Sequence, residues 1–407
     1  MIRRIFPGTA VAVLATCFAL NMFGRGLGDT YVVFVLPLEH EYGWTRSQLT
    51  SVYSIYLLMH GFTSPLVGLI FDRLGPRWVY TTGLACMCAA FFLAAGLSNL
   101  WQFYLFVGGM IGLGVSLTGM VPGSALIARW YRERLSTAIG IAFSAAGVGT
   151  IIFVPLTQAL VGEYDWRVAY RALGAVLLVL APIVAFLVPW DRFYAGHPER
   201  AHVAKLQPGE EGWTLAKAVR TRLYWGLCQV FFFTATAMFT VIVQLVAFFV
   251  DVGFSPITAA SAYGALGFMS AMSVMGSGFT SDRFGYRQTI TATFIGTATG
   301  MALLLVLTYN ASPVLLALFV PIFGLCMGVR GPIVSSISTR YFAGPNVATI
   351  YGTIYSTNAV GAAFGSLMGG LLHDLTGGYR AALAVAMVCV VIASTPFWTV
   401  PALRNFR

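Results

Sequence analysis

Residues 68–77 read GLIFDRLGPR, and residues 278–287 read GFTSDRFGYR. Both stretches fit the pattern G-x3-D-R-x-G-x-R, and they lie 210 residues apart in a chain of 407. The same spacing joins Tyr53 to Tyr263, so the correspondence extends beyond the motif itself. A period this long, kept without a gap through polar and aromatic positions, indicates two copies of one structural unit.

The composition places this repeated unit in a membrane. Hydrophobic residues make up 58% of the chain and charged residues 9%, which leaves too few polar side chains to cover a water-soluble globule of this length. Because about 20 helical residues cross a bilayer, apolar stretches of that length predict transmembrane helices. Twelve such stretches occur, at residues 8–37, 46–71, 78–97, 101–128, 135–160, 167–189, 222–250, 256–280, 288–308, 312–338, 347–372 and 380–401.

These stretches predict an all-α membrane protein in which twelve transmembrane helices form two six-helix parallel repeats. They are too long and too continuously apolar for the alternating strands of a membrane β-barrel, which run for roughly ten residues. A polar segment separates six spans from six and contains one short helical stretch at 214–220. We therefore expect an N-terminal half at 1–190, a cytoplasmic linker at 191–221 and a C-terminal half at 222–407.

The net charge of +10 does not predict a nucleic-acid partner, because the charges are distributed according to the membrane. With an inside N-terminus, 18 of the 24 Lys and Arg residues fall on the same side of the predicted spans. This positive-inside pattern predicts that both termini are cytoplasmic. The first apolar run lacks a small-residue cleavage site, so we treat it as a mature span. The expected location is the cytoplasmic (inner) membrane of a bacterium.

Nothing in the sequence indicates a cofactor or a metal. All six cysteines lie inside predicted spans, where they act as small apolar residues and predict neither a disulfide framework nor a metal site. The sequence has no nucleotide-binding loop, so gradients must drive any transport. We therefore expect a protein that is not an enzyme.

The motif G-x3-D-R-x-G-x-R, placed after the second span and again after the eighth, resembles the cytoplasmic loops of the major facilitator superfamily. The stretches EYGWTRSQ after span 1 and RWYRERLSTAIGIAFSAAGVG before span 5 resemble its monocarboxylate transporter and oxalate:formate antiporter branch. The resemblance implies a monomeric transporter whose midplane substrate site is lined by spans 1, 4, 7 and 10. Members of that branch commonly carry a substrate-binding arginine in span 8, whereas residues 256–280 contain no charged residue.

The two motif loops predict a cytoplasmic gate. Each aspartate is placed to accept hydrogen bonds from a helix N-terminus or to pair with arginines, and such a latch must break when the cytoplasmic side opens. The alternative is a tight turn combined with a positive-inside signal, which explains the arginines but not the repeated acid. The predicted gate residues are Gly68, Asp72, Arg73, Arg77, Gly278, Asp282, Arg283 and Arg287.

Two predicted spans carry an arginine near their middle. In span 1, Asn21, Arg25 and Asp29 follow an i, i+4, i+8 spacing and form one polar stripe. Span 10 contains Arg330 in the sequence GVRGPIVSS and has no acidic residue. Two guanidiniums in a low-dielectric site favour an anion, and their planar fork favours a carboxylate or a phosphate. The alternative for span 1 is an internal ion pair that binds no ligand.

Coupling to protons requires a titratable group inside the membrane. Asp29 is the one carboxylate well inside a predicted span, and His60 is the one histidine there. Imidazole titrates near neutral pH and suits a proton carrier, although a buried neutral histidine with a hydrogen bond explains His60 equally well. We expect Tyr56, Tyr355 and Asn358 to shape the substrate cavity.

The sequence therefore predicts a secondary active transporter of a small organic anion, a mono- or dicarboxylate, that works by alternating access. Arg330 and Arg25 would bind the anion with the help of Asn21, and Asp29 and His60 would carry the coupled proton. Proton symport and exchange with a counter-anion fit the sequence equally well. Two alternatives stay open: a proton-driven exporter of amphipathic drugs, and a membrane sensor that keeps the fold without transporting a solute.

Overall fold

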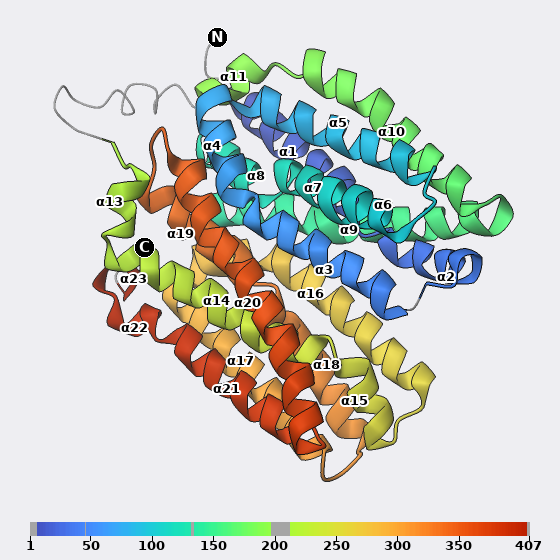
Figure 1. Cartoon of the computed structure of the whole chain (residues 1–407). Coiled ribbons are helices and arrows are strands. Elements are labelled where there is room, and N and C mark those ends of the chain that lie inside the picture. The colour runs from blue at the N-terminus through green and yellow to red at the C-terminus, as the bar shows by residue number, and fades with distance from the viewer. Residues whose placement is uncertain (1–5, 45, 132–133, 197–211, 405–407) are drawn as a thin grey trace. The chain divides into compact units, whose positions relative to one another are not determined.

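The computed structural model of the chain describes residues 6–44, 46–131, 134–196 and 212–404, and the regular structure in these ranges is helical (Figure 1). Contacts divide the chain into two compact units. Unit 1 consists of Met1–Arg132, Ala142–Leu215 and Thr339–Ser356, and unit 2 of Glu133–Ile141, Ala216–Ser338 and Thr357–Arg407. One end of span 5 and one end of span 11 therefore pack with the unit formed mainly by the other half of the chain.

The helices are grouped by these units. Unit 1 holds α1 (Phe6–Gly28), α2 (Tyr31–Tyr42), α3 (Arg46–Phe62), α4 (Ser64–Leu74), α5 (Pro76–Ala94), α6 (Leu100–Phe103), the π-helix η2 (Tyr104–Ile111), α7 (Gly112–Thr118), α8 (Met120–Ala128), α10 (Trp166–Phe186) and α11 (Trp190–Ala195). Unit 2 holds α14 (Arg222–Ile242), α15 (Leu245–Val252), α16 (Pro256–Phe284), α17 (Tyr286–Leu307), α18 (Pro313–Met327), α21 (Arg380–Ser394), α22 (Pro396–Thr399) and α23 (Pro401–Arg404). Four helices have residues in both units: α9 (Leu135–Glu163), α13 (Leu215–Val219), α19 (Arg330–Tyr341) and α20 (Val347–Thr376).

Each predicted span coincides with one helix or with consecutive helices, in agreement with the twelve-helix fold. Within the described ranges, nine helical stretches are long and apolar enough to cross a membrane, or ten if the bent pair α3 and α4 is one span. Helices α16 and α20 complete the twelve with 29 and 30 residues, and both are richer in Gly, Ser and Thr. The short helix predicted in the linker is confirmed as α13, while linker residues 197–211 lie outside the described residues.

The four spans expected to line a substrate site are all interrupted. Span 1 changes from α1 to α2 at residues 29–30, and span 4 from α7 to α8 at Gly119, whose φ of −93° and ψ of −144° are not helical. Span 7 changes from α14 to α15 at 243–244, and span 10 from α18 to α19 at 328–329. At the break of span 1 the backbone keeps hydrogen bonds to the preceding turn, since the N–H groups of Asp29 and Thr30 donate to the carbonyls of Arg25 and Leu27 at 2.9 and 3.2 Å. The charged residues of spans 1 and 10 lie at two of these breaks.

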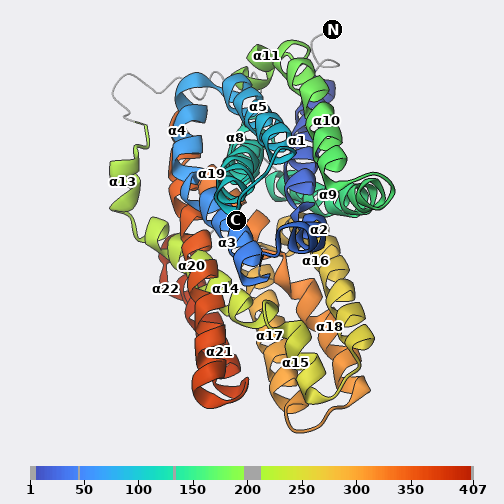
Figure 2. The same ribbon diagram turned by 45° about the vertical axis from the view of Figure 1, so that its right-hand side comes forward.

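In unit 1, α5 and α10 lie side by side (Figures 1 and 2). One face of α10 follows the helical period and exposes large apolar side chains, including Leu178 and Val179, as expected of a surface in contact with lipid. The opposite face packs on α5, where the Gly174 carbonyl accepts a hydrogen bond from Cys88 Sγ at 3.4 Å. The buried residues of α10 are Trp166, Ala169, Tyr170, Leu173, Gly174, Leu177, Val184 and Ala185.

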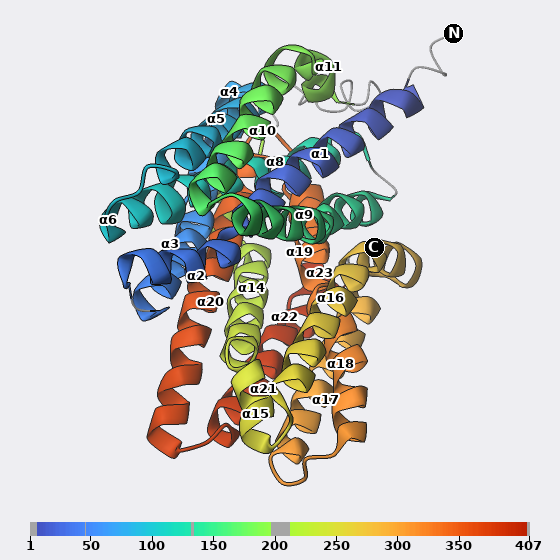
Figure 3. The same cartoon turned by 90° about the vertical axis from the view of Figure 1, so that its right-hand side faces the viewer.

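In unit 2, α16 lies beside α18 (Figure 3), and α14 packs on the second part of α20. The α14–α20 contact depends on small residues, because a Cβ added at Gly361 or Gly365 would lie 2.2 Å from a carbonyl oxygen of α14. The hydroxyls of Thr236 and Thr240 donate to the carbonyls of these two glycines at 3.1 and 3.0 Å. Small residues and hydroxyls of this kind hold transmembrane helices together where lipid provides no hydrophobic drive.

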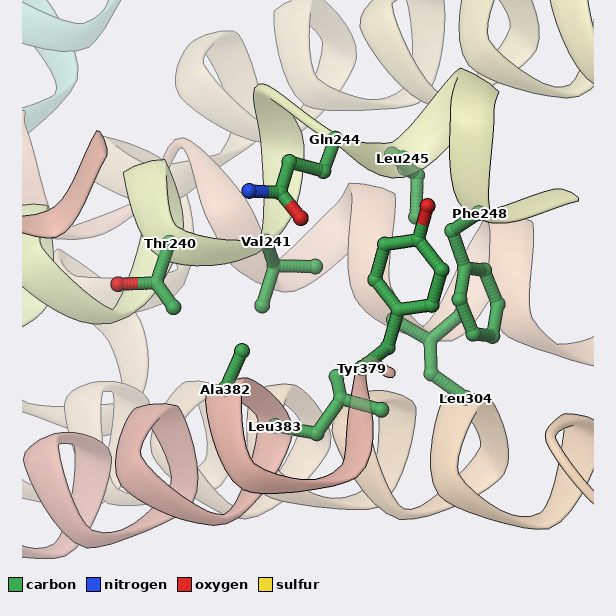
Figure 4. Close-up of a pocket in the computed structure, with 9 residues that line it drawn as sticks. All are labelled: Thr240, Val241, Gln244, Leu245, Phe248, Leu304, Tyr379, Ala382 and Leu383. Atoms are coloured by element: carbon green, nitrogen blue, oxygen red, sulfur yellow. The ribbon is translucent and has the colours of Figure 1, made fainter. Parts of the chain in front are cut away.

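A small cavity lies at the break of span 7 (Figure 4). Its volume of about 20 Å³ is enough for one water molecule but not for an organic anion. In the described part of the chain, the Gln244 side chain at its edge makes no hydrogen bond, which suits an ordered water. The lining residues are Thr240, Val241, Gln244, Leu245, Phe248, Leu304, Tyr379, Ala382 and Leu383.

Gly149 determines how closely α9 approaches α1. A Cβ at this position would lie 2.3 Å from the Met22 carbonyl oxygen and 2.9 Å from the Gly26 Cα, both backbone atoms that cannot swing aside. We expect Gly149→Ala to destabilise the protein by about 1–3 kcal/mol and to lower its unfolding temperature in detergent. The matched control is Gly162→Ala on the same helix, where an added Cβ meets nothing within 4 Å. Equal unfolding temperatures for the two variants would refute this packing.

Candidate functional site

The candidate site in unit 1 is built on an ion pair in the last turn of α1. The Arg25 Nε lies 3.1 Å from Asp29 Oδ1 and 3.2 Å from Asp29 Oδ2, in the i, i+4 geometry predicted from the sequence. Since Arg25 lies in the last turn of α1 and Asp29 at the break before α2, the pair sits where α1 gives way to α2 in span 1. The side chains of Arg25 and Asp29 remain 28% and 20% exposed, so protein atoms do not fully cover the pair.

Asp29 contacts only one of the three guanidinium nitrogens of Arg25. Asp29 approaches only Nε, and within the described residues no hydrogen bond involves Nη1 or Nη2. The Tyr56 ring lies 5.7 Å from the guanidinium carbon, a distance at which a cation is attracted to an aromatic face. The arginine therefore keeps two N–H-bearing nitrogens available for a further acceptor.

Thr150 of α9 is a third member of this site. Its Oγ1 lies 3.1 Å from Asp29 Oδ2 and 3.0 Å from the Ala146 carbonyl oxygen, one turn earlier on the same helix. Sequence analysis did not identify this residue. A single threonine in a continuously apolar span carries no signal of its own, and only the packing of span 5 on span 1 shows its role.

Two glycines of the stretch FGRGLG bring the ion pair close to its neighbours. A Cβ at Gly26 would lie 2.6 Å from the backbone of Gly149 on α9, and a Cβ at Gly28 would lie 2.8 Å from the Tyr56 hydroxyl. Both contacts are shorter than real Cβ atoms allow. Gly26 and Gly28, which follow Arg25, therefore permit the close packing that places α9 and α3 beside the pair.

The predicted tyrosines and histidine lie on α3 and α20 of the same unit. Tyr56 is 2% exposed and stacks on Tyr53 with a ring-centroid distance of 5.3 Å. One turn further along α3, the buried His60 ring meets Tyr355 edge-on at 5.7 Å. Unit 1 thus brings together five predicted site residues: Arg25, Asp29, Tyr56, His60 and Tyr355.

Asn21, predicted as a ligand, makes a structural contact. Its Nδ2 donates to the Ala142 carbonyl oxygen at 2.9 Å, and the side chain is 8% exposed. This bond joins α1 to α9 one turn before the ion pair. The polar stripe of span 1 therefore begins with an anchor to span 5 and continues with the charged residues.

Arg330 lies in unit 2 and is 2% exposed. Its Nη2 donates to the Thr293 carbonyl at 3.0 Å and to the Thr297 hydroxyl, and its guanidinium carbon lies 4.4 Å from the Phe294 ring centroid. All three partners belong to α17, the ninth span, rather than to a span expected to line the substrate site. Among the described residues, Nε and Nη1 have no hydrogen-bond partner and no carboxylate pairs with this arginine. The predicted residue Asn358 is also in unit 2, partly buried on α20.

The two motif aspartates bind helix N-termini, the first of the two predicted arrangements. Asp72 accepts from the backbone N–H of Ala348 at 3.3 Å, and from the N–H and the hydroxyl of Thr349 at 2.7 Å each, at the start of α20. Asp282 accepts from the N–H and the hydroxyl of Thr137 at 3.1 and 2.6 Å, at the start of α9. Repeated residues therefore make equivalent contacts: span 2 with span 11, and span 8 with span 5.

The motif glycines and arginines have different roles from the aspartates. A Cβ at Gly68 would lie 2.2 Å from the Ala348 carbonyl oxygen, and a Cβ at Gly278 would lie 2.2 Å from the Ser136 carbonyl oxygen. Among the described residues, no recorded salt bridge joins a motif arginine to a carboxylate. Arg73 is exposed, and the guanidinium carbons of the others lie near aromatic rings: Arg77 at 5.6 Å from Phe186, Arg283 at 5.6 Å from Phe284 and Arg287 at 3.9 Å from Trp398.

The first span of each half ends near an acidic residue that contacts the sixth span of the same half. Glu41 accepts from the Trp166 indole at 2.6 Å and from Arg167 Nη1 at 3.0 Å, at the start of α10. At the repeat-equivalent position, Asp251 accepts from the Tyr379 hydroxyl at 2.6 Å, just before α21. The first and sixth spans of each half are therefore tied together by corresponding acids.

The Arg167 and Trp166 hydrogen bonds hold the pKa of Glu41 below its ordinary value of 4.5. A carboxyl with a lowered pKa in the folded protein contributes stability above pH 4.5, and this contribution is lost as the pH falls through the lower value. We expect the unfolding temperature of the parent to fall more steeply below pH 4.5 than that of Glu41→Gln. The contribution is small because the side chain is 36% exposed. If the unfolding temperatures of the parent and of Glu41→Gln fall equally with pH, the Glu41 contacts contribute no pH-dependent stability.

Comparison with known proteins identifies the family of this chain. The family model described as Major Facilitator Superfamily matches residues 14–277 and 225–404. The chain belongs to this superfamily. Its two motif loops, its twelve spans and the repeated hydrogen bonds of its motif aspartates are features of one fold, and it is an integral membrane protein of a transporter family.

Curated relatives of this superfamily member include monocarboxylate transporters. The chain is 27% identical to monocarboxylate transporter 13 of Rattus norvegicus, over 98% of this chain and 92% of the relative. It is 24% identical to monocarboxylate transporter 12 of the same species, over 94% and 83%. It is 26% identical to the MFS-type transporter YcxA of Bacillus subtilis, over 95% and 94%. The resemblance to the monocarboxylate transporter branch is therefore confirmed.

Solved structures show the same fold. The proton:xylose symporter XylE superposes with a TM-score of 0.78 at 13% identity, covering 97% of this chain and 96% of that one. The human organic anion transporter MFSD10 superposes with a TM-score of 0.68 at 18% identity, covering 95% and 98%. At these identities the structures establish the fold alone, and the substrate has to be argued from the site.

Proposed function

We propose that this superfamily member carries a small organic anion, a mono- or dicarboxylate, across the membrane by alternating access. The observation that carries the proposal is the Arg25 guanidinium, which faces Asp29 with Nε while Nη1 and Nη2 remain free of hydrogen bonds within the described residues. Two adjacent N–H-bearing nitrogens form a planar fork that matches the two oxygens of a carboxylate. Relatives named monocarboxylate transporters support the same substrate chemistry.

Charge balance supports a proton as the coupled species. Before Arg330 joins the anion, the charges of Arg25 and Asp29 cancel, so the ion pair of unit 1 is neutral by itself. A bound monoanion adds one negative charge inside the membrane, where uncompensated charge is costly. A proton on Asp29 restores neutrality, so one monoanion and one proton cross together without net charge. Exchange of one anion for another leaves Asp29 ionised and is the second coupling mode that this site supports.

The other predicted residues take supporting roles in this proposal. His60 is a second proton candidate, and Tyr56, Tyr355 and Asn358 shape the space around the anion. Asn21 acts as the anchor of α1, because its amide N–H is used by the α9 backbone. Arg330 is a second anion ligand, and its two unpartnered nitrogens favour that role. Because it is 2% exposed, the anion reaches it only after its side chain leaves α17.

The gate and the location complete the proposal. The two halves, 1–190 and 222–407, move as bodies, and both motif aspartates release their helix ends when the motif side opens. That side is cytoplasmic, and the protein is a monomer in the cytoplasmic membrane of a bacterium with both termini inside. The positive-inside distribution of arginines and lysines supports this orientation.

Uptake by reconstituted protein tests the function. Liposomes carrying the purified chain are offered a panel of mono- and dicarboxylates, with and without a pH gradient or an internal anion. We expect saturable uptake of at least one carboxylate, accelerated by an alkaline interior for symport or by an internal anion for exchange. If only cationic amphiphiles are transported or compete, the site exports such compounds and the anion proposal fails.

A further inference from the structure

Thr150 offers one hydroxyl proton to two acceptors. Its Oγ1 lies within hydrogen-bond distance of both Asp29 Oδ2, at 3.1 Å, and the Ala146 carbonyl oxygen, at 3.0 Å. A hydroxyl donates a single hydrogen but has two lone pairs with which to accept. At any moment it therefore donates either to the carboxylate of α1 or to the carbonyl of its own helix.

We infer that Thr150 is a positioning residue that holds Asp29 in both of its protonation states, an inference that rests on the proposed proton role of Asp29. With Asp29 ionised, Thr150 donates its hydrogen to Oδ2. With Asp29 protonated, the new O–H on the carboxyl donates to Thr150 Oγ1, and Thr150 turns its own hydrogen to the Ala146 carbonyl. The proton on Asp29 comes from water on the uptake side and returns to water on the release side, so the hydroxyl ends the cycle unchanged.

A buried proton carrier needs hydrogen-bond partners in both its charged and its neutral form. A carboxyl that alternates between charged and neutral forms changes from an acceptor into a donor, and a partner that can only donate leaves the neutral form unsatisfied. Arg25 can only donate. Thr150 can accept as well, and its alternative acceptor is already in place one helical turn away at 3.0 Å. Both forms of Asp29 are therefore hydrogen-bonded without movement of the backbone.

The charged and titratable groups around Asp29 come from three helices. Arg25 is on α1; Tyr53, Tyr56 and His60 are on α3; and Tyr355 is on α20. The neighbouring part of α9, residues 142–157, contains no ionisable side chain. Substitution of Thr150 therefore leaves every titratable group in place and changes only the hydrogen bonding of Asp29 and of the Ala146 carbonyl.

The test compares Thr150→Val, which keeps the shape but removes the hydroxyl, with Thr150→Ser, which keeps the hydroxyl. Initial rates of carboxylate uptake into liposomes are measured between pH 5 and pH 8. A hydrogen bond to a charged group is stronger than one to a neutral group, so loss of the hydroxyl penalises the ionised form of Asp29 more. We expect Thr150→Val to move the half-maximal pH upward by about one unit, a tenfold change in proton affinity, and Thr150→Ser to keep the parent value.

A loss of rate at an unchanged half-maximal pH in Thr150→Val would overturn the inference, since it is the result expected of a packing residue. The same holds if Thr150→Ser shifts the profile as far as Thr150→Val. The proposed function is tested separately by Asp29→Asn. If that variant keeps the pH dependence of the parent, the proton role of Asp29 fails, whatever Thr150 does.

Discussion

Arg25→Gln is expected to reduce carboxylate uptake by at least about a hundredfold. In the proposed complex the two free nitrogens of Arg25 donate two charge-assisted hydrogen bonds to the substrate, each worth about 1.5–3 kcal/mol. Loss of both is worth roughly 3–6 kcal/mol, and every 1.4 kcal/mol is tenfold in affinity. The substitution also removes the positive charge that balances Asp29 in the empty site and the anion once Asp29 is protonated. The measurement is the initial rate of uptake of a radiolabelled carboxylate into liposomes.

Two further variants separate binding from folding. Arg25→Lys keeps the charge but replaces the planar fork by a point charge, and we expect an intermediate loss. Arg25→Gln combined with Asp29→Asn removes both charges, so that no unpaired carboxylate is left in the site, yet it should not recover uptake. Recovery in the double variant would mean that Arg25 serves only to neutralise Asp29. Uptake by Arg25→Gln at the parent rate would remove Arg25 from the site altogether.

The second large effect is expected from the latch. Asp72→Ala and Asp282→Ala each leave helix N–H groups without an acceptor, a loss of about 0.5–2 kcal/mol per helix end. Together the two losses amount to about 1–4 kcal/mol and favour the form in which the motif side is open by roughly fivefold to seven-hundredfold. Because transport requires both forms, we expect each single variant to be slower than the parent and the double variant to be nearly inactive.

A buried serine reports the opening directly. Ser136 is 0% exposed next to this latch, where its Oγ lies within hydrogen-bond distance of the Tyr286 and Ser336 hydroxyls, at 2.9 Å each. In a Ser136→Cys background, we expect Asp282→Ala to accelerate labelling by a water-soluble maleimide. The protein without the added cysteine gives the background from native thiols. Asp191→Ala, an exposed acid with no recorded contact among the described residues, is the matched control and should not change labelling. Equal labelling rates for Asp282→Ala and Asp191→Ala in the Ser136→Cys background would contradict the latch.

The fold could be predicted from the sequence because each sequence feature that indicates it is either local or repeated in the two halves. Span length and hydropathy depend on the bilayer and not on partners, so the twelve spans coincide with the helices. The acids of GLIFDRLGPR and GFTSDRFGYR could be linked because they recur at one spacing, and the structure places both at helix ends. The breaks in spans 1, 4, 7 and 10 were only partly visible, since glycine and proline occur in many unbroken helices of this chain.

The site was predictable only where its geometry lies within one helix. Arg25 and Asp29 are four residues apart, and helical spacing alone pairs them. Contacts between helices were not predictable, because they depend on which faces pack together. For that reason the sequence did not reveal Thr150, the hydrogen bond from the Asn21 amide to the Ala142 carbonyl, or the position of Arg330 against α17.

Direct binding is the most immediate test of the central claim, that this protein recognises a carboxylate through Arg25. Titration calorimetry on the purified protein compares a carboxylate with its uncharged amide and with the corresponding amine, compounds of similar size that differ in charge. The account predicts that the carboxylate alone binds, and that Arg25→Gln abolishes the signal. Binding of the amide or the amine with the affinity of the carboxylate would contradict it.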